Sequence, residues 1–108
     1  MEIKELEKFA EAEIKELDRK YGVENDKEKD SWAYALKIGE ELGELYDELL
    51  SHKGYQRKEK MKEFDKKEIE KEIADVLIST IILAKNLKID INDLLEKRLL
   101  ELHLRKKI

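Results

Sequence analysis

Two pairs of acidic residues, each with a spacing of three, are the strongest chemical signal in the chain. Glu41 and Glu44 lie in KIGEELGELYDELL (37–50), and Glu72 and Asp75 lie in KEIADVLIST (71–80). On an α-helix, residues three apart project from neighbouring points of one face. If two such helices packed side by side, four carboxylates would converge and repel one another unless a cation lay between them. Oxygen ligands without Cys or His indicate Mg²⁺, or Mn²⁺, rather than zinc.

Helices are the elements that must position these acids. Apolar residues at three- and four-residue steps predict an all-α fold, with a four-helix bundle-like arrangement. The predicted helices cover 3–21, 32–50, 65–87 and a last stretch from about 93 to the basic tail at 105–107. The apolar stripe of helix 3–21 consists of Ile3, Leu6, Ala10, Ile14, Leu17 and Tyr21. Gly22 is the predicted stop of that helix, and the predicted caps of the later helices are Asp30 or Ser31, Asp65, and the stretch Asp90 to Asp93. The predicted connections are 23–30 and 51–64.

The acids border the apolar side of their helices. Ile38, Leu42, Leu45 and Leu49 form the apolar stripe of helix 32–50, and Glu41, Glu44 and Glu48 line one flank of it. Helix 65–87 is apolar over much of its circumference, which predicts a central position. The midpoint between the two acidic pairs falls at Lys58, inside the predicted loop, so a simple antiparallel hairpin would bring both pairs to one height.

Composition limits the class of protein. The chain has 108 residues, no Pro, no Cys and 46% charged residues, which favours one all-α domain over 1–108. A core this small is marginal unless subunits share it, so a homo-oligomer is expected. No apolar run is long enough for a membrane span and no signal peptide is evident, which predicts a cytoplasmic protein with no membrane partner. The net charge of −4, with acids and bases interleaved, disfavours nucleic-acid binding.

The acidic pairs occur in a sequence context that resembles a known family. EELGE at 40–44 and EIAD at 72–75 resemble the EExxE and ExxD signatures of the MazG-like, all-α nucleoside triphosphate pyrophosphatases, and the resemblance covers about residues 32–98. It implies Mg²⁺-dependent hydrolysis of a nucleoside triphosphate to the monophosphate and pyrophosphate, in a homodimer or homotetramer. By the same resemblance Glu41, Glu44, Glu72 and Asp75 would hold the metal, and Glu40 would orient or deprotonate the attacking water.

Several basic and aromatic residues are candidates for contacts to the nucleotide. Lys97 resembles a family lysine that faces the phosphates. Ser79 and Glu101 stand where Tyr and Asn are common in relatives, so the nucleoside contacts are expected to differ. The remaining candidates are Lys53, Arg57 and Lys58 for the phosphates and Trp32, Tyr34 and Tyr55 for the base; Trp32 is equally suited to a core or an interface, and His52 and His103 are predicted to be surface residues.

Two other functions remain open at this point. A phosphoribosyl-ATP pyrophosphohydrolase of the same superfamily would use the same acids. A helical interaction module, whose acids bind a structural cation or none, would need no substrate. Pyrophosphate release with Mg²⁺ from a panel of nucleotides separates the two enzymatic hypotheses from the hypothesis of an interaction module.

Overall fold

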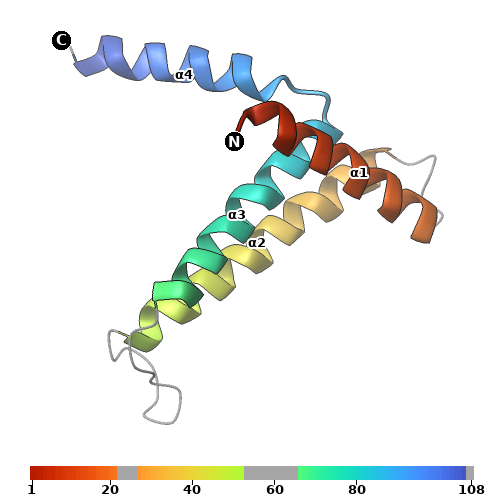
Figure 1. The fold of residues 1–108 in the computed structure, drawn as a ribbon, viewed down its shortest axis with the longest axis horizontal. Helices are drawn as coiled ribbons and strands as arrows, with labels where there is room; N and C mark the ends of the chain where they lie inside the picture. Colours follow the sequence, from red (N-terminus) through yellow and green to blue (C-terminus); the bar gives the residue numbers. More distant parts are fainter. Residues whose placement is uncertain (22–26, 53–65, 107–108) are drawn as a thin grey trace.

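The protein is all-α, as the sequence predicts. The computed structural model describes residues 1–21, 27–52 and 66–106, and the helices of these segments are α1 (Ile3–Tyr21), α2 (Lys27–His52), α3 (Lys66–Asn86) and α4 (Ile91–Lys106). Figure 1 shows α2 and α3 side by side, α1 crossing them near one end, and α4 extending away from that end. No helix within the described segments is both long and apolar enough to span a bilayer.

The α2–α3 hairpin is the body of the molecule. The apolar stripe of α2 that includes Ile38, Leu42 and Leu45 is half-buried on the side where α3 packs. At the open end of the hairpin the hydroxyl of Ser31 donates a hydrogen bond of 2.6 Å to Oδ1 of Asn86. α3 contacts each of the other three helices, which confirms its predicted central position.

α1 packs across α3 through the stripe predicted for it. Ala10 lies in the middle of this stripe and is fully buried, and Leu6 and Ile14 on either side are half-buried. Nζ of Lys85, on α3, lies 3.8 Å from a carboxylate oxygen of Glu7 and 3.1 Å from one of Glu11. Because Ala10 is small, α1 and α3 can approach closely at this point, and Lys85 links the two helices beside it.

The turn into α4 is tightly specified, although α4 itself is sparsely packed. Lys88 adopts a left-handed backbone with φ of 60°, which L-residues rarely do. Oδ1 of Asp90 accepts a hydrogen bond of 3.0 Å from the backbone N–H of Asp93, confirming the predicted cap. Ile91 is 5% exposed and anchors the first turn. Beyond it, every described residue of α4 is exposed.

Two predicted boundaries of α2 are wrong. The helix begins at Lys27, so 27–30 are helical and not a connector, and neither Asp30 nor Ser31 caps the helix. Charged residues with good helix propensity at 27–29 extend it backwards. Ser51 is helical and not in a loop, and its hydroxyl donates to the carbonyl oxygen of Glu48 at 2.8 Å. The predicted stop at Gly22 and cap at Asp65 lie outside the described residues.

Candidate metal centre

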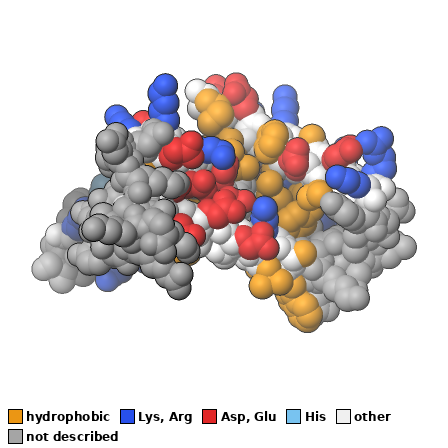
Figure 2. Space-filling view, turned by 90° about the horizontal axis from the view of Figure 1, so that it is seen from below, with side chains coloured by type: hydrophobic (Ala, Val, Ile, Leu, Met, Phe, Trp, Pro, Cys, Tyr) orange, Lys and Arg blue, Asp and Glu red, His pale blue; other side chains and the backbone are white. Residues whose placement is uncertain are grey.

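Three carboxylates from two helices meet halfway along the hairpin. Glu41 comes from α2, and Glu72 and Asp75, one turn apart, come from the facing side of α3. One oxygen from each of the three lies within 4.8 Å of the others. The arithmetic that placed both acidic pairs at one height is therefore confirmed for these three residues. In Figure 2 acidic side chains gather in the middle of the face shown, beside exposed hydrophobic ones.

Burial distinguishes this cluster from ordinary acidic helix faces. Glu41 is 8% exposed and Glu72 is 7% exposed, while Asp75 is half-buried. The Oε2 atoms of Glu41 and Glu72 are buried and have no hydrogen-bond partner among the residues that the structure describes. A buried charged oxygen without a partner is costly, because it has lost water and gained nothing in return.

The electrostatics of the cluster are those of crowded like charges. Burial, followed by the charge of Glu44, raises the pKa of the Glu72 carboxyl above its ordinary value of 4.5, and the charge of Asp75 acts in the same direction. Lys71 opposes these effects. The folded chain alone thus disfavours the ionised form of Glu72, and a cation would reverse that preference.

Lys37 is a partner of the cluster that the sequence analysis missed. Its Nζ lies 3.2 Å from Oε1 of Glu41 and 3.5 Å from Oε2 of Glu40. The hydrogen bond and charge of Glu41 raise the pKa of Lys37 above its ordinary value of 10.5. The spacing of four between Lys37 and Glu41 on one helix was the available signal.

The other predicted acids lie around the three that converge. Glu44 is exposed, yet close enough to Glu72 to raise its pKa. Glu48, one turn further along α2, is half-buried. The Glu40 side chain is 67% exposed and faces outwards beside Lys37.

Of the predicted substrate-binding residues, the two that the structure describes, Lys97 and Trp32, do not lie beside the carboxylates. Lys97 lies on exposed α4 and pairs with Asp93 at 3.4 Å. Trp32 is 62% exposed on α2, nine residues before Glu41 and about half a turn around the helix from it. Tyr34 is half-buried on the same helix, and His103 is exposed on α4. Lys53, Tyr55, Arg57 and Lys58 lie outside the described residues, and the side chain of His52 is not described.

The cluster fits a hard divalent cation. Its donors are carboxylate oxygens only, the set that Mg²⁺ and Mn²⁺ prefer. Two of the oxygens are buried without a hydrogen-bond partner in the described segments, and a bound cation would satisfy them. Glu41, Glu72 and Asp75 are therefore the residues that could hold such an ion, with Glu44 beside them.

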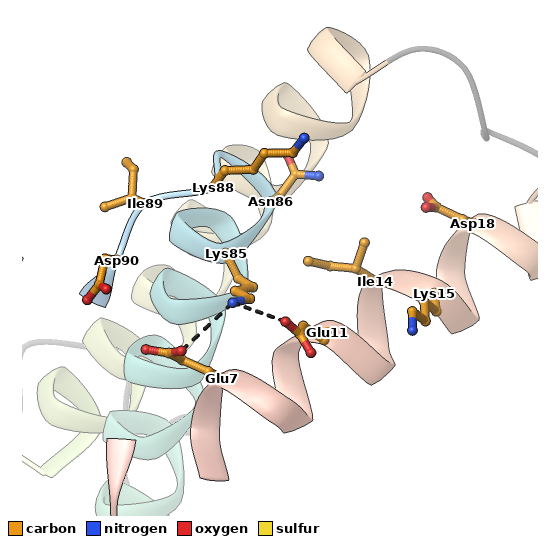
Figure 3. A pocket seen from close by; sticks show the side chains of 10 residues that line it. All are labelled: Glu7, Glu11, Ile14, Lys15, Asp18, Lys85, Asn86, Lys88, Ile89 and Asp90. Atoms are coloured by element: carbon orange, nitrogen blue, oxygen red, sulfur yellow. Dashed lines mark ion pairs between the residues drawn. The ribbon is translucent and has the colours of Figure 1, made fainter. Parts of the chain in front are cut away.

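A separate cleft of about 590 Å³ lies between α1 and the end of α3. Figure 3 shows Lys85 in this cleft, pointing between Glu7 and Glu11. Hydrogen bonding to Glu11 raises the pKa of Lys85 above 10.5, so this lysine is held charged by its neighbours. Its role is to tie α1 to α3.

The fold and the cluster define a class: all-α proteins in which a helical hairpin brings together carboxylates that could hold a cation. Comparison with protein families identifies the group within that class: the model of the MazG-like family matches residues 33–106. The chain belongs to the MazG-like family. Neither the curated proteins nor the solved structures include a significant match.

Proposed function

We propose that the protein is a nucleoside triphosphate pyrophosphohydrolase that uses Mg²⁺, or Mn²⁺, to release pyrophosphate and a nucleoside monophosphate. The observation that carries the proposal is the convergence of Glu41, Glu72 and Asp75, with two buried carboxylate oxygens that lack a hydrogen-bond partner in the described segments, in a member of the MazG-like family. A nucleotide-directed hydrolase activity of this type is what the family suggests.

The carboxylates would act by holding charge where the phosphates bind. A triphosphate carries about four negative charges, so an acidic site can receive it only through cations. A bound divalent cation would neutralise charge on the phosphate oxygens and lower the pKa of a bound water. Glu41, Glu72 and Asp75 would hold it, with Glu44 as a further ligand. Glu40, exposed beside them, would accept the proton of the attacking water.

Charge compensation of the leaving pyrophosphate is assigned to basic side chains. Lys37, already beside Glu41, would turn towards a phosphate once a cation takes its place. Lys97 would contribute if α4 of this or another copy reaches the substrate, and Lys53 and Arg57 are the further candidates. Trp32 lies on the far side of α2 from Glu41, so it would stack on the base only of a substrate held by another copy.

Pyrophosphate release from a panel of ribo- and deoxyribonucleoside triphosphates tests the proposal. With Mg²⁺ present we expect turnover of at least one substrate, and a loss on the order of 100-fold or more in Glu72→Gln and Asp75→Asn. Glu70→Gln is the matched control, because Glu70 lies on the same helix, is exposed and pairs only locally with Lys66 at 3.7 Å.

Absence of release from every nucleotide would refute the enzyme proposal. Full activity in both cluster variants would refute the assignment of the carboxylates. Mg²⁺-dependent stabilisation without turnover would instead favour a structural cation site.

A further inference from the structure

Lys37 lies on the outer side of the carboxylate cluster. Its Nζ is 3.2 Å from Oε1 of Glu41 and 3.5 Å from Oε2 of Glu40. The side chain of Lys37 is 55% exposed, whereas that of Glu41 is 11% exposed. The lysine therefore reaches from solvent to a carboxylate that is mostly buried, where water and salt screen the attraction less than they do at the surface.

The pair between Lys37 and Glu41 differs from an ordinary pair on a helix surface. Lys66 and Glu70 show the ordinary kind on α3: they lie 3.7 Å apart, and both side chains are exposed. Exposed pairs of this kind add little to stability and neutralise no buried charge. The partner of Lys37, in contrast, is one of the three carboxylates that could hold a metal ion.

A tethered ammonium has an advantage over free monovalent ions at this place. Three carboxylates attract any cation, and the physiological ionic strength is about 0.15 M. The ammonium of Lys37 is confined within about 6 Å of its Cα, so its local concentration is on the order of 1 M. It carries the same single charge as Na⁺ or K⁺. A free monovalent ion therefore has no advantage in charge, and it is less concentrated at Glu41 than the lysine already there.

A divalent cation competes on different terms. At equal distance its double charge is attracted about twice as strongly by each carboxylate. It would also contact the buried Oε2 atoms of Glu41 and Glu72, which have no hydrogen-bond partner among the residues that the structure describes. Once such an ion neutralises Glu41, the charge that holds Lys37 in place is lost and the lysine is released.

We propose that Lys37 is the residue that makes this site selective for divalent over monovalent cations, because its ammonium occupies Glu41 until a doubly charged ion displaces it. This selectivity rests on the cation site of the proposed function and does not depend on hydrolysis. Monovalent salt would then neither fill the site nor weaken its affinity for Mg²⁺ beyond general screening.

Calorimetric titration of Mg²⁺ into the metal-free chain, in NaCl and in choline chloride at one concentration of about 0.5 M, separates occupancy of the site from screening. Both salts screen charges equally, but the methyl groups of choline keep carboxylate oxygens away from its charge. The dissociation constant of the wild-type chain should be the same in the two salts. For Lys37→Gln, Mg²⁺ should bind on the order of 5-fold more weakly in NaCl, the effect of Na⁺ filling the site with a dissociation constant of about 0.1 M.

Two further variants control for net charge and for the side chain. Lys66→Gln removes one charge from an exposed pair on α3, so its affinity for Mg²⁺ should be the same in both salts, as in the wild type. Lys37→Arg restores a single positive charge and should restore this insensitivity to Na⁺. Melting temperatures in EDTA give an independent readout: relative to choline chloride, NaCl should stabilise Lys37→Gln more than it stabilises the wild type.

Equal sensitivity to Na⁺ in the wild type and in Lys37→Gln would overturn the proposal, as would a wild-type chain that binds no Mg²⁺. An effect of the same size in Lys66→Gln would also overturn it, because the loss of net charge would then explain the result. The expected salt pattern without pyrophosphate release from any nucleotide would support the role of Lys37 and refute only the hydrolase proposal.

Discussion

Replacing Glu72 by glutamine separates the stability of the chain from its affinity for a cation. The substitution keeps the size of a 7%-exposed side chain and removes one of three crowded charges. Two like charges at 4.8 Å, the upper limit of the separations between the three ligand oxygens, repel by about 1 kcal/mol in water and about 3.5 kcal/mol at an effective dielectric constant of 20. Because Asp75 is half-buried, we expect the metal-free variant to gain about 1–3 kcal/mol in free energy of unfolding.

Mg²⁺ should cancel or reverse the difference in free energy of unfolding between the two proteins. At a concentration 100 times its dissociation constant, a cation stabilises the native state by about 2.7 kcal/mol. The wild-type chain should show this gain and Glu72→Gln should lose most of it. Urea unfolding of both proteins, in EDTA and in excess Mg²⁺ at one protein concentration, measures all four free energies. Glu70→Gln should behave as wild type in both buffers. A metal-free variant less stable than wild type, with the Mg²⁺ gain intact, would refute the reasoning.

The pH dependence of this stability difference has a definite sign. Because the pKa of Glu72 is raised, the native state holds its proton more tightly than the unfolded state does. The contribution of this carboxyl is therefore most favourable below the ordinary pKa of 4.5, and is lost as pH rises from there through the native pKa. Melting curves in EDTA should show the advantage of Glu72→Gln growing over that interval and then levelling off. An advantage that does not change with pH would contradict the assignment.

Three further predictions concern the neighbours of the cluster and the helix ends. Lys37→Gln removes the ammonium group that pairs with Glu41 at 3.2 Å, so calorimetric titration should show Mg²⁺ binding a few-fold tighter. Weaker binding would count against competition between Lys37 and Mg²⁺ for Glu41. Lys85→Met removes the ion pairs between α1 and α3 and should lower the melting temperature at neutral pH. Since the pKa of Lys85 is raised, the difference in melting temperature from the wild type should shrink as pH rises past 10.5. A difference that stays constant up to about pH 12 would contradict this prediction. Asp90→Ala removes the cap of α4 and should cost about 1 kcal/mol of unfolding free energy, seen by chemical denaturation, whereas an unchanged value would show that the cap is dispensable.

The sequence predicted the parts of the structure that depend on periodicity within a helix. The apolar stripe around Ala10, the cap at Asp90 and the level at which Glu41 meets Glu72 all follow from helical geometry. The start of α2 was missed because charged residues of good helix propensity carry no apolar period. The roles of the four metal ligands, the nucleotide contacts and the single-domain assignment over 1–108 stay predictions.

Long-range placement could not be read from the sequence. Nothing in the spacing of Lys85 reveals that it faces Glu11, more than 70 positions away, because that contact depends on how α1 crosses α3. The direction of α4 depends on the backbone of Lys88, a residue with no turn signature. The apolar residues of α2 and α4 were recognisable, but periodicity does not tell an apolar side chain that another helix of the chain buries from one that stays exposed.

The hydrogen bond between Ser31 and Asn86 has a consequence for the register of the hairpin. A seam of leucines and isoleucines tolerates sliding of one helix past the other by a turn, about 5.4 Å, because one branched side chain replaces another. The Ser31–Asn86 contact of 2.6 Å tolerates no such slip, and it stands about 21 Å along α3 from Glu72. A slip that opened this contact would also separate Glu41 from the acids of α3. The hydrogen bond between Ser31 and Asn86 therefore favours the one register of α2 and α3 in which the distant carboxylates meet.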